Sequence, residues 1–451
     1  MSHKIVSSIN LPYRRSLIAA LALPLLLSAC GGGGGATSTT PSSNSASTPT
    51  GTPTGTPTGA PTGAPTGTPT TTSNQLESVV YEFGSYPGDA IDAGELLQGS
   101  DGNLYGASTS GGLNNHGTVF RFDPTTNTET VICNFGSNVA DITQGEYPYV
   151  LIQGSDGKLY GIADEGGTNN NGVLFSVDPT TSTETVLYSF GKNETPPGGG
   201  SGSFLQGNNG VLYFAEGNAG SSVIASFNLV TNTEAVLYTA PQNATLGNLL
   251  QGSDGNLYGF NSGFSSGSGG ADGGSLGGLG GGAYGGGALF RFDLSTNTMT
   301  TLYSFGAQVT DPINPYSLIQ GSDGNLYGVA TLPESNNFYL FEFNLASQTF
   351  STYCESSGRG AVIQGNNGLF YLSNNRGGVL GIGSIQSCNV STNTMTTLYS
   401  FGTETNDISM NPFVMLQGAD GNLYGLAAGG VPGFMQGDGT MFKINLSNSA
   451  N

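Results

Sequence analysis

A short phrase recurs seven times along the 451-residue chain and constrains its fold more than any other feature. Each copy has an apolar run, then Gln-Gly, two small polar residues with Gly, and an apolar residue followed by Tyr. The Gln residues stand at positions 98, 153, 206, 251, 320, 364 and 417, so the spacings are 55, 53, 45, 69, 44 and 53 residues. Repeats of this size, rich in strand-forming residues and without a helical pattern, predict a β-propeller or a related array.

Each repeat is expected to contain four short strands, which we denote A to D in chain order. Strand A is the apolar run before Gln-Gly. An Asp-Gly or Asn-Gly pair follows in all seven copies and predicts a tight hairpin, because a type I′ turn needs positive φ at both central residues. Strand B is Leu-Tyr-Gly or a close variant, and strand D is the segment 183–190 or a relative of it.

Strand C alternates between polar and apolar side chains. One position is apolar in every copy: Phe122, Val177, Phe227, Phe292, Phe343, Cys388 and Ile444. The residue before it is always polar, and this period of two indicates a strand with one buried face. An Asx residue follows directly: Asp123, Asp178, Asn228, Asp293, Asn344, Asn389 and Asn445. Metal binding is one interpretation of these acids, but Asn in four copies favours turns capped by the Asx side chain.

The two ends of the repeat region complement each other. The seventh repeat stops after strand C, at 442–445, while an unpaired D-like segment, 77–83, precedes the first strand A. The N-terminal strand can therefore complete the last blade, which removes the exposed edge of an open array. An open β-solenoid is the alternative, but it gives no reason for the deficit to match the surplus. The sequence thus predicts an all-β, seven-bladed β-propeller closed by its N-terminal strand, over residues 76–451.

Residues 1–29 are predicted to be a lipoprotein signal peptide. Lys4, Arg14 and Arg15 form a positive region, and the apolar stretch 17–27 is short for a membrane span. The segment ending in Cys30 resembles the bacterial lipobox, in which the Cys receives lipid. An ordinary signal peptide with an incidental Cys is the alternative. The resemblance implies lipidation at Cys30 and, because Gly31 stands where an inner-membrane retention signal places Asp, export to the outer membrane or cell surface.

Residues 30–75 are expected to be a disordered linker. This segment starts with the lipidated Cys, contains a glycine run and repeats Thr-Pro-Thr-Gly, and has no apolar pattern able to form a core. Beyond the leader, 7 basic residues remain against 30 acidic ones, a net charge of −23. That balance argues against nucleic acid and anionic lipid headgroups as partners. Cations, neutral glycans and basic proteins stay open.

The repeats resemble the tandem-repeat family called GloVer. Its members carry Gly-Ser-Asp-Gly-Asn-Leu-Tyr-Gly, a Gly-rich stretch and Gly-Thr-Val-Phe in succession, and these motifs stand here at 99–106, 111–117 and 117–120. The resemblance covers about residues 94–450. It implies a surface-anchored repeat protein, but no reaction or ligand, so it supports the architecture and the localisation only.

Three cysteines remain besides Cys30: Cys133, Cys354 and Cys388. An odd number cannot pair completely, and no spacing resembles a zinc site. Cys388 replaces an inward apolar residue of its repeat, which favours a role as buried filler. A bridge between Cys354 and Cys388 stays open for an exported protein.

Comparison of the repeats shows which face is specialised. The A–B and C–D turns are nearly constant, whereas the B–C and D–A loops, which open on the other face, vary in length and content. Binding residues tend to lie on such loops. The candidate ligand-binding residues on that face are Asp92, Glu95, Asp141, Glu146, Tyr149, Asp164, Asp311 and Tyr316. Acids with aromatics can bind Ca²⁺ and a sugar ring. The alternative is solvated loop charge, with aromatics filling the blade junctions.

The sequence offers little sign of catalysis. His116 is the only His beyond the leader, which favours a polar loop residue, and no motif for a catalytic set or a cofactor is present. We therefore expect no cofactor, with Ca²⁺ as the open exception. The prediction is an outer-membrane or cell-surface lipoprotein that meets the membrane through its lipid, with a non-catalytic binding or scaffolding propeller for a glycan or protein. The alternative is a polysaccharide-active enzyme, a hydrolase or lyase, that uses loop carboxylates.

Overall fold

The computed structural model describes residues 76–136, 145–192, 194–195, 204–218, 221–241, 244–261, 286–308, 310–333, 337–356, 358, 360–403, 409–429 and 438–448. The predicted signal peptide and linker, with Cys30, lie outside this part of the chain. Within it, no helix has the length and apolar character needed to cross a membrane.

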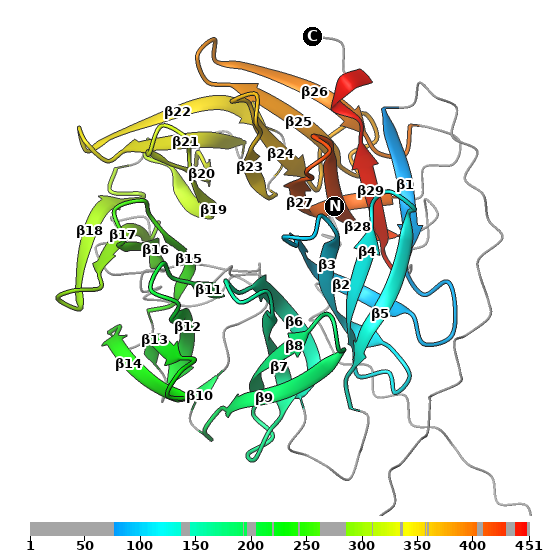
Figure 1. Cartoon of the computed structure of the whole chain (residues 1–451). Helices are drawn as coiled ribbons and strands as arrows, with labels where there is room; N and C mark the ends of the chain where they lie inside the picture. Colours follow the sequence, from blue (N-terminus) through cyan, green and yellow to red (C-terminus); the bar gives the residue numbers. More distant parts are fainter. Residues whose placement is uncertain are drawn as a thin grey trace, which may run out of the picture. The chain divides into compact units, whose positions relative to one another are not determined.

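The described strands form seven antiparallel sheets arranged in a ring (Figure 1). Blade 1 contains β2 (Ala90–Gln98), β3 (Leu104–Gly111), β4 (Thr118–Asp123) and β5 (Thr128–Asn134). Blade 2 contains β6 (Gly145–Gln153), β7 (Leu159–Gly166), β8 (Val173–Asp178) and β9 (Thr183–Ser189). Blade 3 contains β10 (Glu194–Thr195), β11 (Phe204–Gln206), β12 (Leu212–Asn218), β13 (Ser221–Asn228) and β14 (Thr233–Thr239). Blade 4 contains β15 (Leu246–Gln251), β16 (Leu257–Asn261), β17 (Ala288–Asp293) and β18 (Thr298–Ser304). Blade 5 contains β19 (Ile313–Gln320), β20 (Leu326–Thr331), β21 (Phe338–Asn344) and β22 (Thr349–Ser356). Blade 6 contains β23 (Val362–Gln364), β24 (Phe370–Asn374), β25 (Ser384–Asn389) and β26 (Thr394–Ser400). Blade 7 contains β27 (Ser409–Gln417), β28 (Leu423–Gly429), β29 (Thr440–Ile444) and β1 (Glu77–Glu82).

The closure predicted from the repeat count is confirmed. Strand β1 pairs antiparallel with β29, with Glu77 opposite Ile444 and Glu82 opposite Thr440. The last blade therefore consists of three C-terminal strands and one N-terminal strand, and the chain is a seven-bladed β-propeller (Figure 1). Each blade of the ring thereby has its full set of strands, and no blade is left without its outer one.

Blade 3 departs from the expected four strands. The two-residue strand β10 pairs with the end of β12, where Glu194 lies opposite Asn218, while the short β11 pairs with the start of β12. Strand A of this blade is thus split into two pieces. The remaining blades follow the A–B–C–D order.

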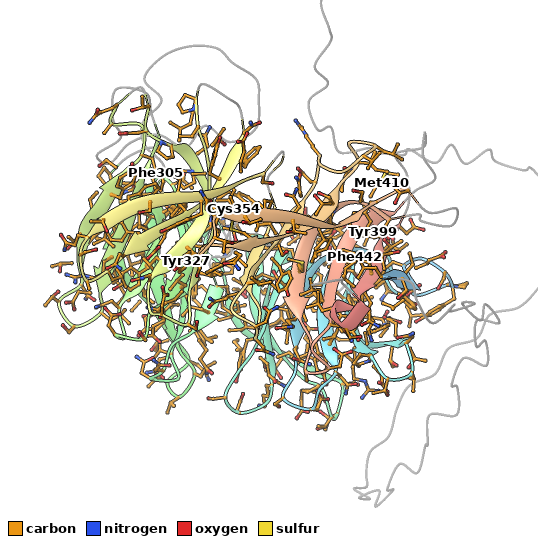
Figure 2. All side chains as sticks on the ribbon, turned by 90° about the horizontal axis from the view of Figure 1, so that it is seen from above. Phe305, Tyr327, Cys354, Tyr399, Met410 and Phe442 are labelled. Atoms are coloured by element: carbon orange, nitrogen blue, oxygen red, sulfur yellow. A yellow bond between two sulfur atoms is a disulfide. The ribbon has the colours of Figure 1, made fainter. Side chains whose placement is uncertain are left out.

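The core lies between neighbouring blades. The alternating apolar positions of strand C are fully buried, with Phe122, Val177 and Phe292 each 0 % exposed. Figure 2 shows Phe305, Tyr327, Tyr399 and Phe442, all buried, among the packed strands. Burial of such aromatic side chains is the main apolar contribution to a fold of this kind.

The glycine of Leu-Tyr-Gly is needed for close packing. A Cβ at Gly106 would lie 2.2 Å from the ring of Phe120, its cross-strand partner. In blade 3 the large side chain is in strand B and the small one in strand C, because Phe214 lies opposite Ala225. The pair keeps one large side chain in each arrangement, so volume is conserved across the two strands.

One disulfide links two blades. Cys354 of β22 and Cys388 of β25 are bonded, with their Cα atoms 5.9 Å apart, so the bridge joins blade 5 to blade 6 (Figure 2 labels Cys354). The bridge that the sequence left open is therefore formed, and the interpretation of Cys388 as a filler thiol is wrong, although the residue is buried. Cys133 is a buried free thiol. The pairing depends on how two adjacent blades face each other, which the spacing of the cysteines does not reveal.

Candidate functional site

The strand order gives the ring two faces of different character. The A–B and C–D turns lie on one face, which we call the constant face because these turns have nearly the same length in every blade. The B–C and D–A loops lie on the opposite face, which we call the variable face. The contacts on each face decide which of the recurring polar residues remain available for a ligand.

On the constant face, the repeated Gln residues join the blades. Gln153 Oε1 accepts a hydrogen bond from Ser100 N–H of the preceding blade at 2.8 Å, and its Nε2 donates to Gly157 O of its own turn at 3.1 Å. The same inter-blade bond recurs in the described residues at Gln206, Gln251, Gln320, Gln364 and Gln417. These Gln residues therefore join six of the seven blade junctions by a hydrogen bond to the backbone of the neighbouring blade.

The Asx residue of each A–B turn bonds the Tyr of strand B. Tyr105 Oη donates to Asp101 Oδ2 at 2.8 Å, and in blade 3 Asn209 Nδ2 donates to Tyr213 Oη at 2.8 Å. Equivalent bonds occur in the other five blades, at Tyr160, Tyr258, Tyr327, Tyr371 and Tyr424. Burial raises the pKa of the turn carboxylates, but hydrogen bonds from the Asn after the turn glycine and from this Tyr outweigh it and lower the pKa of Asp101 and Asp254. Bonds from Asn422, Lys443 and Tyr424 likewise outweigh burial and lower the pKa of Asp420 to about 2.

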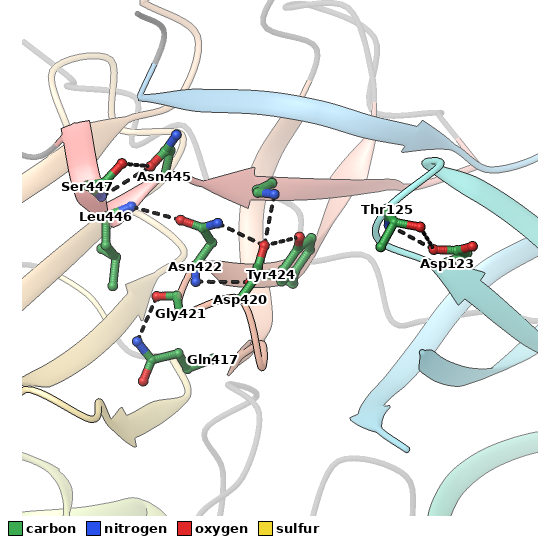
Figure 3. A network of polar contacts seen from close by, with 11 residues as sticks. Asp123, Thr125, Gln417, Asp420, Gly421, Asn422, Tyr424, Asn445, Leu446 and Ser447 are labelled. Carbon is green, nitrogen blue, oxygen red and sulfur yellow. Dashed lines mark hydrogen bonds and ion pairs between the residues drawn. The ribbon is translucent and has the colours of Figure 1, made fainter. Parts of the chain in front are cut away.

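The Asx residue after strand C caps the turn that follows it in all seven blades, which is the C–D turn in blades 1 to 6. Asp123 Oδ1 accepts from the N–H of Thr125 at 2.7 Å, and Asn445 Oδ1 accepts from that of Ser447 at 3.1 Å (Figure 3). The same bond is made by Asp178, Asn228, Asp293, Asn344 and Asn389. The turn interpretation is therefore confirmed, and the recurring acids of the constant face serve the fold.

The predicted ligand residues of the variable face fall into two groups. Asp141 lies outside the described residues. The others are in blade 1 (Asp92 and Glu95, β2), blade 2 (Glu146 and Tyr149, β6; Asp164, β7) and blade 5 (Asp311, before β19; Tyr316, β19). Blade 5 occupies a different part of the ring from blades 1 and 2 (Figure 1). The seven described residues are thus not one site.

Glu146 meets His116 where loops of two blades come together. Glu146 Oε2 lies 3.0 Å from His116 Nδ1, and both side chains are about one-fifth exposed (22 % for His116 and 23 % for Glu146). His116 comes from the B–C loop of blade 1 and Glu146 from the start of β6 in blade 2. The two atoms lie at ion-pair distance, but the contact lacks hydrogen-bond geometry, because His116 Nδ1 has no hydrogen-bond partner within the described residues.

The backbone fixes this pair in place. Tyr147 N–H donates to His116 O at 2.8 Å, and the Tyr147 ring lies 5.4 Å from the His116 ring, centroid to centroid. Tyr147 has φ of 60°, a conformation that costs free energy for a residue with a Cβ. Sequence reasoning missed the partnership of His116 with Glu146, since nothing in the spacing shows that the two loops touch.

Tyr149 and Asp164 lie close enough to interact electrostatically. The negative charge of Asp164, together with burial as the larger cause, raises the pKa of Tyr149. Asp164 is exposed, whereas Tyr149 packs against the core between blades 2 and 3. Tyr149 therefore fills a blade junction, as the alternative interpretation of these aromatics holds.

The two acids of β2 differ in their surroundings. Asp92 is exposed, has φ of 56°, and its N–H donates to Asp438 O at 3.1 Å. Burial and the nearby negative charge of Asp438 raise its pKa. Glu95 keeps some solvent contact but is densely surrounded by protein, which raises its pKa to about 7. A carboxyl with that pKa changes its charge near neutral pH.

The blade 5 residues have structural roles in part. Asp311 Oδ2 accepts from the N–H of Gln308 at 2.8 Å and so closes its own loop. Burial of Tyr303 and, to a lesser extent, the negative charge of Asp311 raise the pKa of Tyr303 to about 12. Tyr316 is half-buried in β19 opposite Val329. Within the described residues, no three His, Cys, Asp or Glu side chains are arranged to hold a metal ion.

Solved structures of other propellers have a similar fold. The oligogalacturonate lyase of Vibrio parahaemolyticus superposes with a TM-score of 0.55 at 8 % identity, covering 84 % of this chain and 96 % of that one. An oligogalacturonate lyase in complex with manganese gives 0.54 at 11 % identity, covering 82 % and 96 %. A fungal alcohol oxidase in complex with copper gives 0.50 at 12 % identity, covering 81 % and 75 %. At these identities the likeness shows the fold alone.

No curated protein matches the sequence significantly. A repeat family does: its profile matches residues 52–223 and 271–451, which is more than half of the chain. The chain belongs to the Gloeobacter/Verrucomicrobia repeat family.

Proposed function

We propose that this protein is a surface lipoprotein whose propeller binds a ligand on the variable face without catalysing a reaction. The main support is the group formed by His116, Glu146 and Tyr147 where blades 1 and 2 meet. It offers polar side-chain atoms and an aromatic ring, partly exposed and held by a backbone hydrogen bond, on loops that differ from blade to blade.

A protein ligand fits this face better than a glycan. Large apolar side chains are exposed in the B–C loops of two blades: Leu113 of blade 1 at 77 %, and Val379 and Leu380 of blade 6 at 80 % and 56 %. Blade 7 separates them in the ring (Figure 1). Exposed apolar groups beside polar ones are typical of protein-binding surfaces.

Binding variants test this proposal. The chain with Cys30→Ser, which lacks the predicted lipid, is immobilised and exposed to envelope proteins of its own organism and to a glycan array. We expect a protein ligand that Leu113→Ser and His116→Ala each weaken about tenfold or more, while Thr125→Ala on the constant face leaves binding unchanged. A protein ligand retained equally by all three variants would refute the assignment of the variable face, and a glycan ligand whose binding is weakened by Leu113→Ser and His116→Ala would refute the choice of protein.

The anchor is tested separately. Mass spectrometry of the mature protein is expected to find a lipid-modified N-terminal Cys30, and Cys30→Ala is expected to move the protein from the membrane fraction to the soluble fraction. An unmodified mature terminus at another residue contradicts the lipoprotein assignment.

A polysaccharide-active enzyme is the second candidate, and one observation favours it. Glu146 Oε2 lies 3.0 Å from His116 Nδ1, and a carboxylate beside a His ring is an arrangement that general-base catalysis uses. Release of reducing ends from a polysaccharide panel, lost in both His116→Ala and Glu146→Gln, would establish it.

A further inference from the structure

Blade 2 departs from the other blades on the constant face. In blades 1, 4, 5 and 7, an Asn follows the turn glycine and its Nδ2 donates to the turn Asp: Asn103, Asn256, Asn325 and Asn422. In the same blades, strand C places a long charged side chain opposite the Tyr of strand B: Arg121, Arg291, Glu342 and Lys443. Blade 2 has Lys158 and Ser176 at these two positions.

The long side chain covers the turn where it is present. Lys443 Nζ lies 3.0 Å from Asp420 Oδ2 and 5.1 Å from the centre of the Tyr424 ring. Blades 3 and 6 also have Ser in strand C, but there Val211 and Leu369 follow the turn glycine and pack against core clusters. Among the described turns, blade 2 alone combines a short strand C side chain with a charged residue after the glycine.

A hollow opens at this place. It has a volume of about 320 Å³ at the junction of blades 2 and 3, with Lys158, Ser176, Asp156, Leu187, Gln206 and Leu229 in its lining. A second hollow of about 190 Å³ shares Lys158 and Ser176 and continues past Asp178, Thr181, Thr183 and Thr185. We call the two together the blade-2 groove.

We propose that the blade-2 groove is a second ligand site, which binds a short neutral saccharide. The hydroxyls of Ser176 and Thr181, the ammonium of Lys158 and the carboxylate of Asp178 present both donors and acceptors, as sugar hydroxyls require. The half-buried Leu187 and Leu229 give apolar contact for a ring face.

Size and charge narrow the ligand. Ligand pockets typically measure about 300–1,000 Å³, so this groove suits one or two sugar rings. The net charge of −23 beyond the leader disfavours an acidic sugar. Hydrogen bonds from Thr180 and, to a lesser extent, the nearby charge of Lys158 lower the pKa of Asp178. This carboxylate is therefore an acceptor at neutral pH.

The chain itself supplies the variant that tests this proposal. Lys158→Asn with Ser176→Arg gives blade 2 the residue pair of blades 1 and 4, which the same fold already accommodates. The chain with Cys30→Ser is screened on an array of neutral and acidic glycans, and the Kd of the best neutral glycan is measured by calorimetry. We expect the double variant to keep its Tm and to bind at least tenfold more weakly. Ser226→Arg, at the matching position of blade 3, is expected to bind as the parent does.

Two results overturn the proposal: no neutral glycan binds the parent, or the double variant binds as tightly as the parent. Preference for an acidic glycan overturns the choice of ligand. His116→Ala on the variable face is expected to leave this affinity unchanged, so the blade-2 groove and the variable-face function succeed or fail independently.

Discussion

The outer strands divide the ring into two regions that fill one position differently. At the strand D position opposite the buried residue of strand C, blades 7, 1, 2 and 3 have Glu77, Glu129, Glu184 and Glu234, whereas blades 4, 5 and 6 have Met299, Phe350 and Met395. Each pairs with the buried apolar residue of strand C, as Glu129 does with Phe122 and Met299 with Phe292. We call the first region the carboxylate half and the second the apolar half.

In the apolar half, this residue packs against the strand D of the preceding blade. The Phe350 ring stacks on Tyr303 with centroids 4.1 Å apart. Met299 belongs to the same cluster as Tyr238, and Met395 to that of Cys354. These contacts are apolar and keep the same strength at any pH.

In the carboxylate half, the same junctions hold acids with incomplete hydrogen bonding. Glu129 Oε2 accepts from Tyr86 Oη at 2.6 Å, but within the described residues Oε1 of both Glu129 and Glu184 has no partner. Burial raises the pKa of each of these two carboxyls to about 7. Burial of the Cys133 thiol and, to a lesser extent, the negative charge of Glu184 raise the pKa of this thiol to about 12. The comparison teaches that this strand D position accepts either a carboxylate or an apolar side chain, and that the position should respond to pH only in the carboxylate half.

The largest effect is expected in the pH dependence of the whole protein. Carboxyls with a raised pKa hold protons more tightly in the folded state, so their contribution to stability is lost as pH rises from about 4.5 to about 8; they include Glu95, Glu129, Glu184 and Glu216. Turn acids with a lowered pKa, such as Asp101 and Asp420, lose their contribution as pH falls below about 4. Calorimetry should therefore find the highest Tm near pH 5. A Tm that rises steadily from pH 5 to pH 8 would contradict the assignment.

A carboxylate placed in the apolar half should be costly. Met299→Glu introduces an acid beside Tyr238 with no partner provided for it, and we expect a loss of about 2–4 kcal/mol at pH 8 and a smaller loss at pH 5. Urea unfolding at both pH values measures it. The exposed neighbour Thr300→Glu is the control and should change stability by less than about 0.5 kcal/mol. Equal losses for the two variants would remove the distinction between the halves.

The reverse exchange is expected to have a smaller effect. Glu184→Met gives blade 2 the residue of blades 4 and 6 and removes a buried oxygen without a partner. We expect a gain of about 1–2 kcal/mol at pH 8 and almost none at pH 5, where the carboxyl is neutral. Glu129→Met should gain less, because it leaves Tyr86 without its acceptor. A gain that is the same at both pH values would show that packing, not charge, separates the two halves.

The sequence predicted the ring, its closure and the positions of its turns because the repeats can be counted and aligned. The type I′ geometry expected for the A–B turns is wrong, since Gly102 has positive φ but Asp101 before it does not. The Asp-Gly or Asn-Gly pair and the Asx residue after strand C each occur seven times, so the places of Asp101 and Asp123 in turns could be predicted, since a residue that recurs in every blade serves what every blade shares. The contact of His116 with Glu146 and the bridge of Cys354 to Cys388 occur once each and join different blades. They depend on how loops and sheets meet in space, and a single sequence carries no signal for that. Lys158 and Ser176, which line the blade-2 groove, differ from the repeat in the sequence. The hollow itself could not be predicted, because it depends on how the neighbouring residues pack around these two side chains.

The closure of the ring by the first strand is the claim on which both faces and both halves depend, and a cross-link tests it most directly. Ser78 and Lys443 are register partners in β1 and β29. Cysteines at directly opposed positions of antiparallel strands lie within reach of a disulfide. In the chain carrying Ser78→Cys and Lys443→Cys, mass spectrometry should find a 78–443 disulfide under mild oxidation, whereas Glu82→Cys with Lys443→Cys should remain unlinked. Absence of the 78–443 bond in the folded protein, or equal linking of both pairs, would contradict a propeller closed by its N-terminal strand.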